Sequence, residues 1–198
     1  MEQCRIDPCV FRMVVDGKVE LSMAVHVDDI VIAGSNETCR YFHAALTTKF
    51  PTSNLGELTW YTGCAFKRNW ELGTLEITQK AFVERMLNRF GVNSSSDIPV
   101  TPGVELCPRE EGEPKGDWPH TEAVGSVMWL STMTRPDISR AMARHSHNPT
   151  DRHWKAVLNI MAYLHGTRGM GLTFVRGSVL DVTAYSDADY ADKSDDRR

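Results

Sequence analysis

The sequence lacks the marks of a membrane or secreted protein. No apolar run approaches the roughly 18 residues that a helix needs to cross a bilayer. The first 18 residues hold no basic region followed by an apolar stretch, so we expect no signal peptide. The five cysteines are odd in number and never spaced C-x-x-C. That pattern argues against a disulfide framework and a zinc knuckle, and it indicates a reducing compartment.

A strong overall charge is also absent. The net charge of −4 excludes a protein that binds nucleic acid through its global charge alone, and 41% hydrophobic residues are typical of a globular chain. The charge is uneven, however: residues 135–176 hold seven arginines and lysines against two aspartates. A basic segment beside an acidic hairpin suits a protein that holds a polyanion near a metal, although an ordinary solvated helix surface explains it equally well.

Hydrophobic periodicity and turn residues predict an α+β protein. Residues 105–122, which are acidic and rich in proline and glycine, predict an exposed linker. In the first half of the chain we expect a β-hairpin in residues 21–33, a helix from residue 36 that Pro51 ends, strands in residues 58–77, and a helix capped by Thr78 and ended by Gly91. In the second half we expect three helices: one at residues 121–133, one that begins at Pro136, and one from an Asp151 N-cap to Gly166. Strands are expected at residues 171–175 and from residue 179.

The sharpest chemical feature is the pair Asp28-Asp29, expected at the tip of the first hairpin between two β-branched runs. Hard oxygen ligands on a rigid turn suit Mg²⁺, which takes one or two carboxylates together with substrate phosphates. Two such ions can clamp the attacking and leaving oxygens of a phosphoryl transfer. From the residues alone, a plain Asp-Asp turn is the commoner interpretation.

Two weaker clusters follow. Asp187, with Asp189 and Asp192 close behind it, comes directly after an expected strand and could hold a metal for phosphodiester hydrolysis; an acidic turn is the simpler interpretation. Zinc binding by His145, His147 and His153 is not expected, because two histidines spaced i, i+2 on a helix point in different directions.

Six blocks of sequence together resemble the Pol polyprotein of copia-type LTR retrotransposons, from its reverse transcriptase into the start of its RNase H. AVHVDDIVIAG resembles the family's YVDD box, and AYSDADYADKSDDRR resembles its GYSDADWAG…DRR opening of RNase H. The other four blocks, in the family's order, are DPCVF, NLGELTWYTGCAF with ITQKAFVERML, PHTEAVGSVMWLSTMTRPDIS, and DRHWKAVLNIMAYLHGTRGMGLTF. Each block is weak alone, but six in sequence are specific.

The resemblance implies an α+β fold with four regions. Residues 1–95 would form a partial reverse-transcriptase palm with its active-site hairpin and the start of the thumb, and residues 96–120 a linker. Residues 121–176 would form a helical thumb/connection region, and residues 177–198 the first strands of an RNase H-like domain. The implied localisation is a cytoplasmic virus-like particle or the nucleus.

The resemblance also implies roles for particular residues. Asp28 and Asp29 would be catalytic and bind Mg²⁺ or Mn²⁺ in the polymerase, and Asp187 would do so in RNase H. The expected partners are an RNA template with a DNA primer, deoxynucleoside triphosphates and other Pol chains, without a membrane. The primer grip would comprise Tyr61, Thr62 and Gly63, and the nucleic-acid backbone would contact Arg135, Arg140, Arg144, Arg152, Lys155 and Arg168.

The chain departs from the family pattern at several places. His26 stands where the family has tyrosine, and Thr62 replaces an apolar residue. The family's other palm aspartate would precede residue 1, and its remaining RNase H ligands would follow residue 198, so we expect no polymerase activity from the chain by itself. We also expect poor solubility, because apolar side chains such as Val25, Val27 and Ile32 would lack partners.

Two alternatives remain. The chain could be a non-catalytic module that binds an RNA–DNA duplex or another Pol chain. A free-standing Mg²⁺ phosphohydrolase is the third hypothesis, and no nearby general base supports it.

Overall fold

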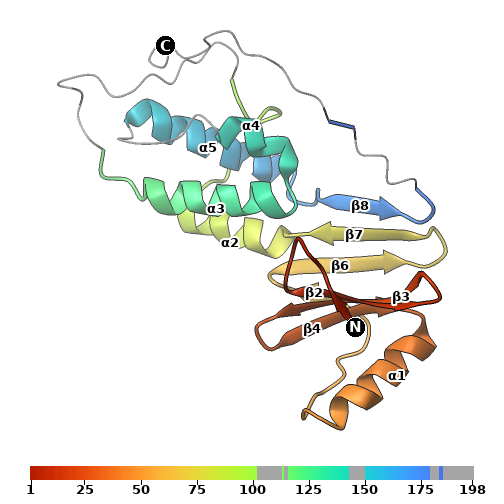
Figure 1. Cartoon of the computed structure of the whole chain (residues 1–198). Coiled ribbons are helices and arrows are strands. Elements are labelled where there is room, and N and C mark those ends of the chain that lie inside the picture. Colours follow the sequence, from red (N-terminus) through yellow and green to blue (C-terminus); the bar gives the residue numbers. More distant parts are fainter. Residues whose placement is uncertain (102–112, 114–115, 143–149, 179–182, 185–198) are drawn as a thin grey trace. The chain divides into compact units, whose positions relative to one another are not determined.

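The computed structural model describes residues 1–101, 113, 116–142, 150–178 and 183–184. The chain divides into two compact units, Met1–Tyr61 and Thr62–Arg198, each combining antiparallel strands with helices (Figure 1). This arrangement confirms the predicted α+β class. The division falls inside the region 1–95 that the resemblance assigns to the palm.

The first unit is a four-stranded antiparallel sheet followed by one long helix. Its strands lie in the order β1-β2-β3-β4. The elements are β1 (Glu2–Gln3), β2 (Val10–Val15), β3 (Lys18–His26), β4 (Asp29–Gly34), α1 (Asn36–Thr47) and the short β5 (Trp60–Tyr61). Strands β2 and β3 are joined by Asp16-Gly17, both with positive φ (49° and 77°), which is the pattern of a type I′ hairpin turn.

The core of this unit is thin. Phe11, Met23 and Ile32 are cross-strand neighbours, so they share one face of the sheet, and α1 contacts β3 and β4. Leu21 is the only buried side chain in this unit, all of whose residues the structure describes. Val27 is 88% exposed, whereas Val25 and Ile32 are half-buried, so the expectation of unpartnered apolar side chains holds for Val27 alone.

The junction between β4 and α1 follows from two residues. A side chain at Gly34 would place its Cβ 2.6 Å from the carbonyl oxygen of Glu20, so the close approach of β3 requires glycine. Ser35 is then the N-cap: its Oγ accepts a hydrogen bond of 3.1 Å from the Thr38 amide. The predicted end of the strand and start of the helix are confirmed.

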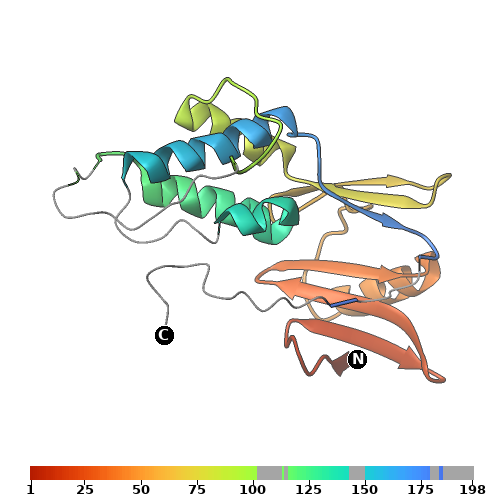
Figure 2. The same cartoon turned by 90° about the horizontal axis from the view of Figure 1, so that it is seen from above.

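The second unit joins an antiparallel sheet to a helical core. The strands are β6 (Cys64–Asn69), β7 (Thr74–Thr78) and β8 (Leu172–Val175), with β7 between the other two. The helices are α2 (Lys80–Phe90), α3 (His120–Met133), the 3₁₀ helix η1 (Pro136–Ile138), α4 (Ser139–Met142) and α5 (Asp151–Gly166). Figure 2 shows α2, α3 and α5 gathered at one end of this unit, with the strands extending from them. Their buried side chains include Val83, Leu87, Val127, Leu130, Val157, Ile160 and Leu164.

Two predicted N-caps were each wrong by one residue. Thr78 is the last residue of β7, and Gln79 occupies the N-cap of α2. Thr150, not Asp151, is the N-cap of α5, where it forms a capping box with His153. Gly91 ends α2 in the left-handed conformation (φ 67°), as predicted.

Candidate functional site

The hairpin between β3 and β4 carries the predicted carboxylate pair, with a different register from the one expected. His26 is the last residue of β3, Asp29 is the first residue of β4, and the two are paired across the hairpin. The turn is therefore Val27-Asp28, and Asp29 belongs to the strand. The prediction that both aspartates occupy the tip was wrong for Asp29, because the strand pairing places the turn one residue earlier.

The turn residue Val27 is strained. Its φ is 57°, and it is the one position of this two-residue turn with positive φ, which is the pattern of a type II′ turn. Glycine is preferred at that position, and a β-branched residue there is an outlier that costs about 1–3 kcal/mol. Since Val27 is also 88% exposed, burial does not offset this cost. Strain of this kind clusters at functional sites, and composition alone gave no signal for it.

The two carboxylates are accessible to a ligand. Asp28 and Asp29 are both exposed. Among the residues that the structure describes, no group of three or more His, Cys, Asp or Glu side chains is arranged to hold a metal ion. Two carboxylates nevertheless fit Mg²⁺, because that ion takes one or two from a protein and completes its shell with water and phosphate oxygens. The hairpin could therefore supply two of the ligands of a Mg²⁺ ion, with the remaining ligands coming from elsewhere.

Tyr61 lies beside this hairpin, more than thirty residues away along the chain. Its ring meets the imidazole of His26 edge to face, with centroids 6.4 Å apart and planes at 78°. Burial raises the pKa of the Tyr61 hydroxyl, and the carboxylate of Asp29 raises it further. The fold thus brings together the first residue of the predicted primer grip and the predicted catalytic hairpin.

The other two residues of the predicted primer grip form a tight turn. Thr62 and Gly63 both have positive φ, at 47° and 81°, which is the pattern of a type I′ turn. Threonine is unusual there, because a β-branched side chain disfavours that conformation. This pair begins the second unit, directly after Tyr61.

The predicted backbone-binding residues fall into three groups. Arg140, Lys155 and Arg168 are exposed. Arg152 is half-buried, and its guanidinium pairs with Glu113 at 3.1 Å. Arg135 is buried. Two further predictions, Arg144 and Asp187, lie outside the described residues.

Arg135 has a structural role that sequence reasoning missed. Its side chain is 2% exposed, and its Nε and Nη2 donate to both carboxylate oxygens of Asp137 at 3.0 and 2.8 Å. It also donates to the carbonyl oxygen and the hydroxyl of Thr167, and Tyr163 donates its hydroxyl to Asp137 at 2.9 Å. Burial alone would raise the pKa of the Asp137 carboxyl, but the hydrogen bonds from Arg135 and Tyr163 lower it. Arg135 is therefore buried and hydrogen-bonded inside the fold, unlike the exposed Arg140, Lys155 and Arg168.

Comparison with known proteins identifies relatives over almost the whole sequence. The retrovirus-related Pol polyprotein from transposon TNT 1-94 of Nicotiana tabacum is 32% identical over 97% of this chain and 15% of its own length. The Pol polyproteins from transposons RE2 and RE1 of Arabidopsis thaliana are 32% and 33% identical over 91% of the chain, which is 13% and 12% of their lengths. No family model and no solved structure matches the chain.

These relatives define the class: the chain is homologous to the retrovirus-related Pol polyproteins of transposons. These homologues are copia-type retrotransposon Pol polyproteins, which confirms the resemblance carried by the six sequence blocks. The chain spans about one seventh or less of the length of these relatives. No helix in the described part of the chain has the length and apolar character needed to cross a membrane.

Proposed function

We propose that this chain is part of the reverse transcriptase of a copia-type retrotransposon, continuing into the start of its RNase H, and that the β3–β4 hairpin supplies two metal-binding carboxylates of the polymerase. The observation that carries the proposal is the strained turn at Val27, which holds Asp28 and Asp29 exposed beside Tyr61. A turn that tolerates strain in order to present two carboxylates is better explained by ligand binding than by packing.

Asp28 and Asp29 would hold Mg²⁺ or Mn²⁺ together with phosphate oxygens of the incoming nucleotide. When bound, the metal neutralises the charge that develops on the transferred phosphoryl group. The chain's own contribution is to fix two carboxylates on a short, hydrogen-bonded hairpin. Because the described residues supply no third carboxylate there, we expect nucleotidyl transfer only when the rest of the polyprotein is present.

Two sets of residues would contact the nucleic acid. Tyr61, Thr62 and Gly63 would contact the primer terminus, and the exposed Arg140, Lys155 and Arg168 would contact backbone phosphates. Such contacts are independent of sequence and weaken as salt increases. The substrates would be an RNA template, a DNA primer and deoxynucleoside triphosphates, and Asp187 would act in RNase H.

The test is primer extension by a chimera in which residues 1–198 replace the matching segment of the TNT 1-94 Pol polyprotein. We expect the chimera to synthesise DNA on an RNA template, and Asp28→Asn or Asp29→Asn to lower the rate at least a hundredfold. The matched control is Asp16→Asn, in the turn between β2 and β3, where asparagine suits the positive φ equally well. Undiminished synthesis by both hairpin variants would overturn the proposal, as would an equal loss in the control.

A further inference from the structure

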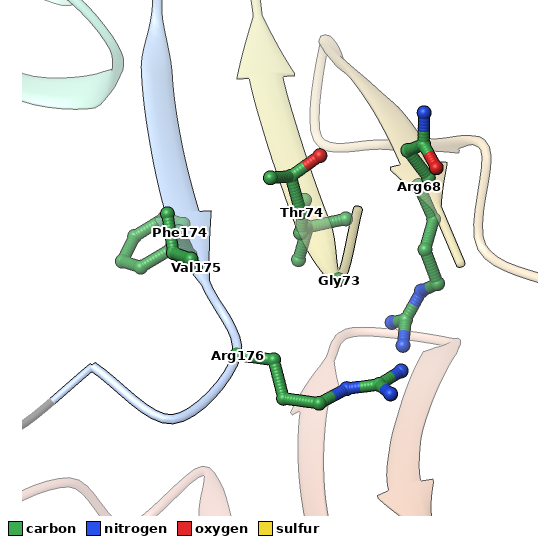
Figure 3. Close-up of a pocket in the computed structure, with 8 residues that line it drawn as sticks. Arg68, Gly73, Thr74, Phe174, Val175 and Arg176 are labelled. Atoms are coloured by element: carbon green, nitrogen blue, oxygen red, sulfur yellow. The ribbon is translucent and has the colours of Figure 1, made fainter. Parts of the chain in front are cut away.

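Two features of the second unit lie outside the proposed function. One is a cavity of about 260 Å³ at the end of the β6-β7-β8 sheet, which is lined by Arg68, Thr74 and Arg176 among others (Figure 3). Arg68 already makes a cation–π contact, with its guanidinium carbon 4.7 Å from the centroid of the Trp70 ring, so we assign the cavity no ligand. The other feature is the start of α5, where a histidine takes part in the capping of the helix.

The N-terminal end of α5 is held by two buried residues that bind each other. Thr150 is the N-cap and is 0% exposed, and His153, three residues on, is 4% exposed. The Nδ1 atom of His153 accepts a hydrogen bond of 3.2 Å from the Thr150 amide and lies 2.9 Å from the Thr150 hydroxyl oxygen. In the usual capping box the acceptor is a Glu or Gln side chain, so an imidazole replaces a carboxylate or an amide here.

These contacts fix the protonation state of His153. A backbone N–H can only donate, so Nδ1 must carry a lone pair, and the proton of the neutral ring lies on Nε2. A second proton, on Nδ1, would face the N–H of Thr150. The Thr150 hydroxyl can turn and accept from that proton, but the amide cannot, and it would be left without an acceptor in a buried site.

The charges around His153 also act on its protonation. Burial lowers the pKa of the imidazole, and Arg152 beside it on α5 lowers it further, whereas Glu113 raises it. Arg152 and Glu113 pair with each other at 3.1 Å, so their effects partly offset. From α3, His120 interacts with His153, whose charge lowers the pKa of His120. The folded chain therefore favours the neutral form of His153.

The remaining helix that packs on α5 brings a neutralised charge. The ring of Phe90, at the end of α2, meets Trp154 edge to face with centroids 6.3 Å apart. The charged residue next to Phe90 is Arg89, and its guanidinium pairs with Glu122 of α3 at 3.1 Å. This ion pair adds little net charge near the start of α5.

We propose that His153 is a pH-sensitive cap of α5, in which the neutral imidazole holds the first turn closed and protonation at Nδ1 opens it. The Trp154 amide donates to the Thr150 carbonyl at 3.0 Å, so release of Thr150 from its capping conformation also releases the first hydrogen bond of the helix. The inference is independent of the proposed function, because it requires neither a metal nor a nucleic acid.

The direction of the effect follows from the two protonation states. Well above pH 6.5, the ordinary pKa of histidine, the closed and the opened turn are both neutral and closure is complete. Below that value the opened turn binds a proton that the closed turn excludes, so opening becomes more favourable as the pH falls.

The experiment is amide hydrogen exchange of the full chain at pH 7.5 and pH 5.5, with each rate compared with that of an unstructured chain at the same pH. The reporters are the amides of Trp154, Lys155 and Ala156 at the start of α5. We expect their opening equilibrium constant to rise by up to about tenfold at pH 5.5, the limit for one histidine that titrates near pH 6.5 only in the opened turn. An unchanged constant would overturn the proposal.

His153→Gln is the decisive variant, because its amide oxygen accepts from Thr150 at every pH. We expect it to keep the protection seen at pH 7.5 and to remove most of the pH dependence. The matched control is His165→Gln, in the last turn of the same helix, where the imidazole contacts the Ser95 hydroxyl. It should leave the pH dependence of the first turn intact. Equal pH dependence in the wild-type chain and His153→Gln, or its loss in His165→Gln, would overturn the proposal.

Two further readings separate the cap from general unfolding. Ile160 and Met161, which are buried in the middle of α5, should open with much smaller constants than the first turn, and equal constants would show that the whole unit unfolds instead. Long-range ¹H–¹⁵N NMR of the wild-type chain should find the His153 proton on Nε2 at pH 7.5. A proton on Nδ1 at that pH would contradict the proposal without recourse to any variant.

Discussion

The imidazole of His26 and the ring of Tyr61 meet edge to face, with their centroids 6.4 Å apart. This contact joins the last residue of β3 to the last residue of β5, which is also the last residue of the first unit along the chain. It places the residue that differs from the family's tyrosine directly against the predicted primer grip. The histidine at position 26 therefore has an aromatic partner in Tyr61.

The strength of this contact can be measured by a double-mutant cycle. We expect His26→Ala and Tyr61→Ala to destabilise the first unit, with a coupling energy of about 0.5–1.5 kcal/mol, as for other aromatic pairs. Tyr61→Phe keeps the ring and should retain most of the coupling. Hydrogen exchange of the β3 and β4 amides is the measurement, and a coupling energy near zero would show that the rings do not support one another.

Relieving the strain at Val27 should stabilise the hairpin. Val27→Gly replaces an outlier with the residue preferred at the first position of a type II′ turn, so we expect about 1 kcal/mol of stabilisation. Val15→Gly is the matched control, because Val15 is also exposed but lies in a strand, where glycine costs about 0.5–1 kcal/mol. Urea denaturation measures the change in the free energy of unfolding, which should be positive for Val27→Gly and negative for Val15→Gly. Destabilisation by both substitutions would contradict strain at Val27.

The second unit should lose stability in mild acid through two buried histidines. His120 and His153 are 6% and 4% exposed, and burial lowers the pKa of both, with a further lowering at His153 from Arg152. Well above pH 6.5 both histidines are neutral in the folded and the unfolded state, and stability is complete. As the pH falls below that value, the unfolded chain binds protons that the folded chain does not, so the free energy of unfolding falls.

The slope of that loss is at most about 1.4 kcal/mol per pH unit for each histidine. Urea denaturation between pH 5 and 8 measures it, and His120→Gln should remove part of the slope. The control is His26→Gln, because His26 is exposed. A free energy of unfolding that is constant across this range would contradict the burial of the two histidines.

Arg135 and Arg168 both belong to the basic segment, but we expect substitution of Arg135 to affect mainly stability and substitution of Arg168 mainly nucleic-acid binding. Arg135→Gln removes a guanidinium that is 2% exposed from its hydrogen bonds to Thr167 and to Asp137, whose side chain is 33% exposed, so we expect a loss of about 1–3 kcal/mol in unfolding free energy. Arg168→Gln should change stability by less than about 0.5 kcal/mol and weaken nucleic-acid binding instead. Thermal melts and salt-dependent binding assays report the two effects. Equal stability losses would contradict the distinction.

Local sequence signals predicted the elements better than the placement of side chains. The hairpin, the Ser35 cap and Gly91 followed from β-branched runs and capping residues. The register of the hairpin could not be predicted from these signals, because it depends on which residues of β3 and β4 pair. The Asp16-Gly17 pair is a further hairpin signal in the sequence.

Long-range partners could not be predicted from the sequence. Arg135 looked like any other arginine of the basic segment, because Tyr163 and Thr167, which bury and bind it, lie almost thirty residues or more away along the chain. The meeting of Tyr61 with His26 of the β3–β4 hairpin is a consequence of folding for the same reason.

The most direct test of the account is whether the hairpin carboxylates bind a divalent cation. The measurement is paramagnetic broadening of ¹H–¹⁵N resonances of the full chain by Mn²⁺. The account predicts that the amides of Val27, Asp28 and Asp29 broaden first, that excess Mg²⁺ restores them, and that Asp28→Asn/Asp29→Asn abolishes the effect. Unbroadened hairpin resonances, or equal broadening in the double variant, would contradict the assignment of this hairpin as a metal-binding site.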